Sequence, residues 1–189
     1  NLQPAGGNWA GGSMNSDNMY RDTSGWYHHV LTFDSTNSTQ ADRLKVYVNG
    51  ERITSWSSES VTSAIGASEA FSFINEDGVV QAFGGLSGKG HGTVGADNQM
   101  AEIVFNDGQA YGPDSYGETK NGVWIPKDPS GLTFGNNGYW LNFASSGDLG
   151  NDVSGNNNDF TVANIAAHDQ MLDSPTFGSE GSANFPAFS

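Results

Sequence analysis

Two segments of the chain, residues 26–33 and 44–48, carry the clearest pattern of hydrophobic and polar positions. The first is rich in aromatic and β-branched residues, and in the second Leu and Val alternate with Lys and Tyr. A period of two is typical of half-buried β-strands. The polar residues 34–43 between them predict an exposed loop. Asn49-Gly50 follows the second strand and predicts a tight turn, because this dipeptide tolerates positive φ angles.

Turn-forming residues punctuate the rest of the chain, and its longest stretches without Gly or Pro have the periodicity of strands. The predicted elements are strands at 100–105, 139–143 and 160–162, a hairpin with Asp77-Gly78 in its turn, and one or two helical turns within 164–172. Residues 54–70 are predicted to be a long connection and residues 84–98 a glycine-rich loop. Together these elements predict an all-β protein with long loops rich in Gly, Asn and Ser.

Composition limits the classes of partner and site. The chain has 189 residues, which suits one domain, and a formal net charge of −14. So acidic a surface repels phosphate backbones and anionic membranes, so we expect no nucleic-acid binding and no membrane insertion. The acidity is compatible with bound Ca²⁺ and equally with solubility alone. The absence of cysteine excludes disulfides and thiolate metal sites, and the sequence has no apolar run long enough to span a membrane.

Several blocks of sequence, in order, resemble a known family. Trp26-Tyr27-His28-His29-Val30, followed by Asp34 and by LKVYVNG at 44–50, resembles the laminin-G and concanavalin A-like jelly rolls. The later blocks are similar to the lectin-like domains of structural proteins in tailed bacteriophages, especially marine ones. Those blocks are MAEIVFNDGQAYGPDSYGE, VWIPKDPSG, FGNNGYWLNF, LGNDVSGNNNDFTV and LDSPT. The resemblance extends from Asp22 to Thr176.

The resemblance implies an antiparallel β-sandwich of the jelly-roll type. It divides the chain into an irregular lead-in (1–21), a sandwich (22–173) and a C-terminal arm or linker (174–189). Because the family has further strands before the Trp26 region, we expect part of the domain to lie upstream of Asn1, or the sandwich to be completed by the C-terminal segment or by a neighbouring subunit. The turn spacing and the aromatic content are compatible with two packed sheets.

The resemblance also implies a non-catalytic protein of the virion. The expected role is a fibre, spike or capsid-surface adhesin that binds host-cell glycans. The alternative is a decoration or joining protein that only holds subunits together, and a glycan hydrolase is the less favoured third reading. Other virion subunits, copies of the same chain and a host surface polysaccharide are the expected partners.

The acidic residues lack the pattern that glycan hydrolysis needs. Glucanases of this fold resemble one another in a Glu-x-Asp-x-x-Glu strand, and a retaining glycosidase places two carboxyl groups about 5 Å apart. Glu102 stands alone on its predicted strand. His28 and His29 are adjacent on a strand, so they point to opposite faces and do not easily share a metal ion. We therefore predict no catalytic residues.

The stretch 148–159 is the best candidate for a metal site. Its oxygen-bearing residues include Asp148, Asp152, Asn156 and Asp159, and its glycines permit tight turns. Carboxylate and amide oxygens are the ligands that Ca²⁺ prefers, although the spacing is not that of an EF-hand. The alternative, which we favour, is a loop of Asx turns whose side chains satisfy its own backbone.

Aromatic residues in the loops are candidates for carbohydrate binding. Sugars stack their apolar face on aromatic rings while neighbouring polar groups bind the hydroxyls. Tyr111, Tyr116, Trp124 and Tyr139 lie in segments rich in Gly and Asn and suit this role. The alternative is that they fill gaps beneath long loops. Trp26, by contrast, is expected to lie in the core.

Overall fold

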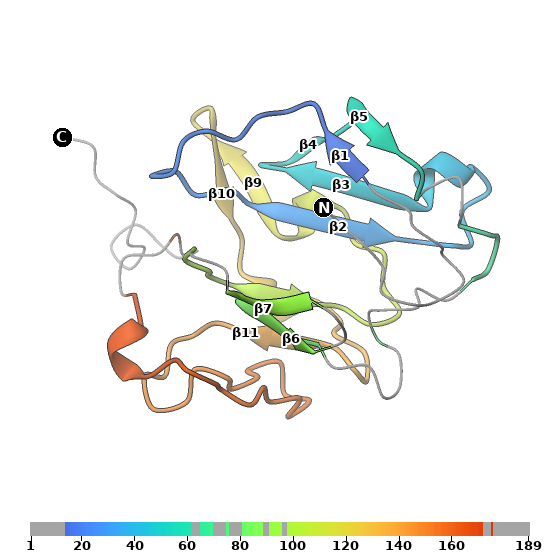
Figure 1. Cartoon of the computed structure of the whole chain (residues 1–189). Helices are drawn as coiled ribbons and strands as arrows, with labels where there is room; N and C mark the ends of the chain where they lie inside the picture. The colour runs from blue at the N-terminus through green and yellow to red at the C-terminus, as the bar shows by residue number, and fades with distance from the viewer. Residues whose placement is uncertain are drawn as a thin grey trace. The chain divides into compact units, whose positions relative to one another are not determined.

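The structure is a computed structural model, and it describes residues 14–61, 65–69, 75, 81–88, 91–95, 98–171 and 175. Within these residues all paired strands are antiparallel, and the helices are single turns of 3-10 helix (Figure 1). The chain divides into two compact units, Asn1–Asn98 and Gln99–Ser189. The prediction of an all-β protein is confirmed at this level. No helix among the described residues is long and apolar enough to cross a membrane.

The described residues of the first unit form three sheets. The β2–β3–β4 sheet has three strands, and β1–β5 and β6–β7 are two-stranded pairs. The elements are β1 (Met14–Ser16), β2 (His29–Phe33), η1 (Gln40–Asp42), β3 (Leu44–Val48), β4 (Glu51–Arg52), β5 (Trp56–Glu59), β6 (Gly85–Gly88) and β7 (His91–Gly95).

The β2–β3 hairpin and the turn after it follow the predicted pattern. The register places Phe33 opposite Leu44 at one end and His29 opposite Val48 at the other. Asn49 and Gly50 have φ angles of 50° and 82°, and β4 turns back directly onto β3. The Asn49 side chain also accepts a hydrogen bond from the His28 backbone N–H at 2.8 Å. The predicted turn and strand pair are therefore confirmed, although β2 begins at His29 and the connecting stretch 34–43 contains η1 and is partly buried.

The core of the first unit covers part of one face of this sheet. The buried cluster consists of Met14, Leu44, Val61 and Ile65, with Phe33, Val46 and Trp56 packed against it. It joins β3 to the β1–β5 pair, which lies beside β3 and β4 in Figure 1. Arg43 lies at the edge of this core, where its guanidinium donates a hydrogen bond to the Ile65 backbone carbonyl at 2.7 Å.

Three sequence-based predictions in the first unit need correction. Trp26 lies before β2, and 37% of its surface is exposed, so it is not a core residue. The stretch 54–70, predicted as a connection, contains β5, and the predicted loop 84–98 contains β6 and β7. Pairing with a neighbour forms these strands, although their glycines and serines show no apolar periodicity. The predicted hairpin at Asp77-Gly78 lies outside the described residues.

The second unit is built from two strand pairs and long connections. β8 pairs with β11 and β9 pairs with β10, while Leu141 makes an isolated bridge to Asp152. The elements are β8 (Ile103–Phe105), η3 (Pro113–Ser115), β9 (Gly117–Lys120), β10 (Val123–Pro126), η4 (Pro129–Gly131), β11 (Tyr139–Leu141) and η5 (Ala167–Asp169).

The strands of the second unit are shorter than the sequence predicts. β8 begins at Ile103 and β11 ends at Leu141, because Glu102 and Phe143 adopt positive φ angles of 50° and 54°. These angles belong to the left-handed region and cannot continue a strand. No strand forms at 160–162, and η5 is the single helical turn within 164–172.

The predicted lead-in 1–21 contains a short strand. This strand is β1, which pairs with β5. The predicted sandwich 22–173 contains the boundary between the two compact units at Asn98 and Gln99.

Candidate functional site

A single buried carboxylate organises the 148–159 loop. Asp152 is 6% exposed, and its two oxygens accept four hydrogen bonds. Oδ1 accepts from the backbone N–H groups of Trp140 and Ser154, at 2.8 and 2.9 Å. Oδ2 accepts from the Ser154 hydroxyl and from the Asn158 N–H, both at 2.9 Å. The loop therefore wraps around one charged side chain that also holds the start of β11.

Two asparagines attach the far side of the loop to residues 135–138. Asn156 Nδ2 donates to the carbonyls of Gly135 and Gly138 at 2.7 and 2.8 Å. Asn158 Nδ2 donates to the Gly138 carbonyl at 2.8 Å. These bonds satisfy backbone carbonyls that no strand would pair, as the interpretation of a self-satisfied loop requires.

The hydrogen bonds also set the charge state of Asp152. Burial by itself raises the pKa of this carboxyl, but the N–H groups of Trp140, Ser154 and Asn158 more than offset it, so the pKa is lowered. Donors that bind the charged form stabilise it. Asp152 is therefore ionised at neutral pH, and its charged oxygens accept hydrogen bonds from the backbone around it.

The four residues predicted to bind Ca²⁺ have different environments. Asp152 and Asn156 are engaged in the bonds described above, whereas Asp148 and Asp159 are exposed. The Asp159 Oδ1 accepts from the Asp152 N–H at 2.8 Å, and the Asp148 carboxylate has no hydrogen-bond partner among the described residues. Among those same residues, no group of three or more acidic or histidine side chains is placed to hold a metal ion. The Ca²⁺ site stays a prediction.

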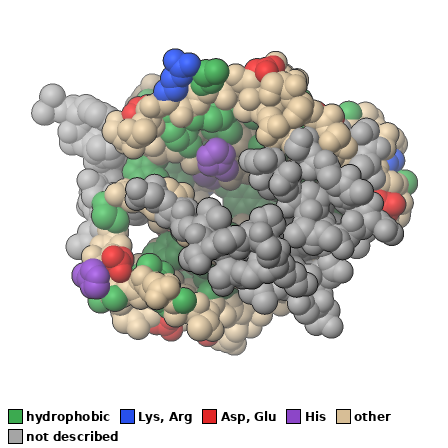
Figure 2. All heavy atoms as spheres, in the orientation of Figure 1, with side chains coloured by type: hydrophobic (Ala, Val, Ile, Leu, Met, Phe, Trp, Pro, Cys, Tyr) green, Lys and Arg blue, Asp and Glu red, His purple; other side chains and the backbone are tan. Residues whose placement is uncertain are grey.

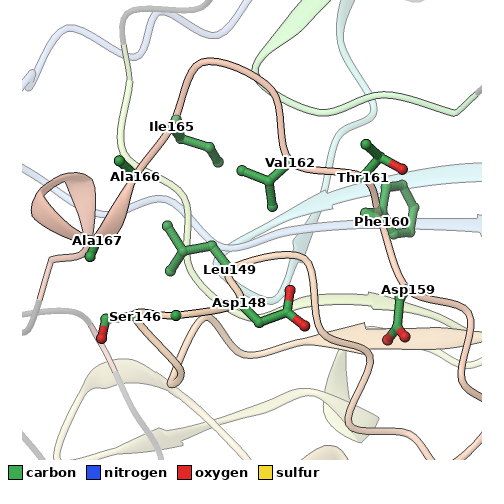
Figure 3. Close-up of a pocket in the computed structure, with 11 residues that line it drawn as sticks. Ser146, Asp148, Leu149, Asp159, Phe160, Thr161, Val162, Ile165, Ala166 and Ala167 are labelled. Carbon is green, nitrogen blue, oxygen red and sulfur yellow. The ribbon is translucent and has the colours of Figure 1, made fainter.

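A pocket of about 450 Å³ opens beside this loop. Its lining residues are Ser146, Gly147, Asp148, Leu149, Asp159, Phe160, Thr161, Val162, Ile165, Ala166 and Ala167. Figure 3 shows the Asp148 carboxylate pointing from one wall toward the segment that carries Asp159 and Phe160, while Leu149, Val162 and Ile165 lie together on the other side. The pocket thus combines two carboxylates, one aromatic ring and an apolar wall.

A backbone hydrogen bond joins the two segments that line the pocket. The Phe160 N–H donates to the Gly150 carbonyl at 2.8 Å, which joins the two walls. A side chain at position 150 would collide with the Phe160 carbonyl, so glycine is required there. The Phe160 ring meets Tyr139 edge to face, with centroids 4.8 Å apart. These contacts connect the pocket to β11.

The four aromatic residues predicted to bind carbohydrate have different environments in the structure. Tyr139 is 8% exposed and packs against Phe105 and Phe160, so it belongs to the interior and is removed from the candidate surface. Burial raises its pKa to about 12. The strand YWL is buried at every position, so its sequence pattern did not distinguish a core tyrosine from a loop tyrosine.

Tyr111 and Tyr116 lie together but use their hydroxyls internally. Their rings meet edge to face at 6.3 Å. Tyr116 donates to Asn106 Oδ1 at 2.6 Å, and the Tyr111 hydroxyl accepts from the Thr133 N–H at 3.2 Å. Burial raises the pKa of Tyr116 to about 12, with a smaller contribution from Tyr111. Both rings remain half-buried, so part of each is still accessible.

Trp124 is half-buried against the neighbouring strand. A Cβ at Gly117 would meet the indole of Trp124 at about 2.5 Å, so the ring lies directly over the glycine. Trp124 therefore packs across the β9–β10 pair, and part of its ring remains accessible.

Glu102 has an unusual environment that the sequence pattern did not reveal. Its φ of 50° is strained for a residue with a side chain, and its Oε2 accepts from the Trp140 indole N–H at 2.6 Å. Burial raises the pKa of Glu102, the Trp140 bond opposes that effect, and the charge of Asp128 adds to it. A raised pKa beside a second carboxylate is a property of general acids.

Sequence reasoning also missed an aromatic surface in the first unit. Tyr20, Tyr27 and His29 form a cluster with centroid separations of 5.2 to 6.5 Å. Tyr20 is 42% exposed and Leu31, on the same face of β2 as His29, is 37% exposed. In Figure 2, hydrophobic side chains gather over β2 and β3 on the face in view. The adjacent Trp26-Tyr27 pair before a strand was the available signal.

Comparison with known proteins gives no assignment: no family model matches the chain, and neither a curated protein nor a solved structure matches it.

Proposed function

We propose that this chain is a non-catalytic domain of a virion surface structure, such as a fibre, a spike or a capsid-surface adhesin, that binds host-cell glycans. The observation that supports it most directly is the pocket between residues 146–149 and 159–167. It offers carboxylates that accept hydrogen bonds from sugar hydroxyls, and the ring of Phe160 beside an apolar wall. Glycan sites combine these groups, and the volume of about 450 Å³ is that of a small-ligand site.

A jelly-roll sandwich of the concanavalin A-like type is part of the proposal. Antiparallel pairing in every described sheet supports it, as do loops that carry most of the polar side chains. The family resemblance of the sequence blocks between Asp22 and Thr176 is the further support. An experimental structure of the full chain that lacked two packed antiparallel sheets would overturn the fold.

Filling the pocket tests the binding function. Ala166 is exposed and lines the pocket, so Ala166→Trp should occupy it and abolish binding of the full chain to a glycan array or to host cells. Ala110 is also exposed but lies outside the pocket, so Ala110→Trp is the matched control and should bind normally. No glycan or cell binding by the wild-type chain at high concentration would contradict the proposal.

A structural role between subunits is the second candidate, and the aromatic surface of the first unit favours it. Tyr20 and Leu31 are 42% and 37% exposed, and exposed aromatic groups are enriched at protein interfaces. If this surface joins copies of the chain, Tyr20→Ala should shift the protein toward monomer in sedimentation velocity. Val123→Ala, an exposed apolar control on β10, should leave the oligomeric state unchanged.

Glycan hydrolysis is the third candidate function, and Glu102 is the residue that favours it. The raised pKa of Glu102 and the neighbouring charge of Asp128 are compatible with acid catalysis, although the Glu102 carboxylate is bound to the buried Trp140 indole. The proposal expects no release of reducing sugar from host polysaccharide. Hydrolysis that is present in the wild type and lost in Glu102→Gln would establish an enzyme instead.

A further inference from the structure

The pocket beside the 148–159 loop carries two carboxylates and no basic side chain. Its lining contains neither Lys, Arg nor His. The charge pattern of the sequence extends this imbalance, because residues 128–189 contain no Lys or Arg. The acidic residues of the same stretch are Asp128, Asp148, Asp152, Asp159, Asp169, Asp173 and Glu180.

The two pocket carboxylates differ from Asp152 in being available to a ligand. Asp148 has no hydrogen-bond partner among the described residues. Asp159 is exposed and uses Oδ1 for the Asp152 N–H, and this bond fixes the orientation of its carboxylate. Asp152, in contrast, accepts four hydrogen bonds and has no remaining capacity without disrupting the loop. Asp148 and Asp159 therefore line the pocket with carboxylate oxygens that solvent and a ligand can reach.

The opposite wall is apolar and partly uncovered. Leu149 is buried at its base, while Val162 and Ile165 are 37% and 49% exposed. Figure 3 places these three side chains beside one another, on the side away from the Asp159 carboxylate. A hydrated metal ion gains nothing from such a wall, and Ca²⁺ needs six to eight oxygen ligands. The pocket suits an organic cation that has an apolar face.

We infer that the pocket binds a glycan through an amino sugar with a free ammonium group. This inference rests on the proposed glycan-binding function and names the class of glycan. The ammonium lies between Asp148 and Asp159, because a charge-assisted hydrogen bond is stronger than a bond to a neutral hydroxyl. The carbon face of the sugar packs on the wall that contains Val162 and Ile165. Uronic and sulfated glycans are repelled, since no basic group lines the pocket to neutralise them.

A pair of oligosaccharides of equal length tests the inference. Calorimetric titration of the full chain at pH 6 compares a glucosamine tetramer with its N-acetylated counterpart, in which an uncharged acetamido group replaces each ammonium group. We expect the glucosamine tetramer to bind at least about tenfold more tightly, and its affinity to fall as salt is raised. Asp148→Asn and Asp159→Asn should each remove most of that preference while keeping the shape of the side chain.

Asp114→Asn is the matched control, because Asp114 is an exposed acid of the same unit that lies outside the pocket. It should leave both affinities unchanged. Equal binding of the two tetramers would overturn the ammonium inference and leave the glycan function standing. Preference for a lysine-containing peptide, or competition by Ca²⁺ alone, would also overturn it. Failure of every glycan would refute the proposed function itself.

Discussion

The β2–β3–β4 sheet and the 148–159 loop are stabilised in opposite ways. The sheet is stabilised by apolar burial, with Leu44 2% exposed and Ile65 fully buried in the first unit. The loop has a different centre, the carboxylate of Asp152, whose four hydrogen bonds replace a hydrophobic interior. Apolar burial is graded and tolerates repacking, whereas a buried charge depends on every partner being present. The second unit should therefore be more sensitive to single polar changes.

Removal of the Asp152 carboxylate should have the largest effect. Asp152→Ala leaves the N–H groups of Trp140, Ser154 and Asn158 without their acceptor, so we expect a loss of about 4 kcal/mol in the free energy of unfolding. Urea unfolding followed by circular dichroism measures it. Asp148→Ala, in the same loop but exposed, should cost less than about 0.5 kcal/mol. Similar losses in both variants would contradict the central role of Asp152.

Truncation of the apolar core should have a somewhat smaller effect. Leu44→Ala creates a cavity beside Met14 and Ile65, and we expect it to lower the free energy of unfolding by about 3 kcal/mol. Leu31→Ala is the control, because Leu31 is 37% exposed and its truncation should cost about 1 kcal/mol or less. Hydrogen exchange should show the loss of protection first in β2 and β3. Loss confined to the second unit would show that the units are not stabilised separately.

Neutralisation of Glu102 should give the smallest effect, with a pH dependence opposite to that of Asp152. Because folding raises the pKa of Glu102, its contribution favours the folded state at low pH and is lost as the pH rises through the folded pKa. Glu102→Gln should therefore stabilise the protein by about 1 kcal/mol at pH 7 and less at pH 4. The amide oxygen still accepts from the Trp140 indole.

The lowered pKa of Asp152 works in the other direction. Its stabilisation is present above the unfolded pKa of about 3.9 and is lost as the pH falls toward the folded pKa.

Thermal melts test the effect of Glu102. Because the charged Glu102 carboxyl destabilises the fold, the melting temperatures of Glu102→Gln and the wild type, measured from pH 3 to 8, should diverge toward neutral pH. Parallel curves would show that the Glu102 carboxyl is not destabilising when charged.

The sequence predicts those elements whose conformation depends on their own residues and not on a distant partner. The alternation in 44–48 and the Asn49-Gly50 turn need no distant partner, and both are present. The pair β6–β7 was missed because glycine-rich strands form only through pairing, which a local pattern does not contain. Trp26 was misplaced because an aromatic residue before a strand has the same composition whether it is covered or exposed.

The candidate site was predictable as a region but not residue by residue. The stretch 148–159 was identified from its oxygen content, and two of its acids, Asp148 and Asp159, line the pocket. The sequence does not distinguish them from Asp152, because an aspartate bound by backbone N–H groups has the same neighbours along the chain as one that faces a ligand. The walls at Val162 and Ile165 depend on the path of the chain after Phe160 and were not predicted.

The bond between the Phe160 N–H and the Gly150 carbonyl has a consequence for the thermodynamics of recognition. It fixes one end of the pocket before any ligand arrives, and the bond from the Asp152 N–H fixes the Asp159 carboxylate in the same way. When a ligand binds the Asp159 carboxylate, the protein therefore loses little conformational entropy. The segment 161–167, which carries the apolar wall, is exposed at every position, so fixing its side chains against a ligand costs conformational entropy. The polar groups of the pocket are thus fixed before a ligand binds, whereas the side chains of the apolar wall become ordered on binding.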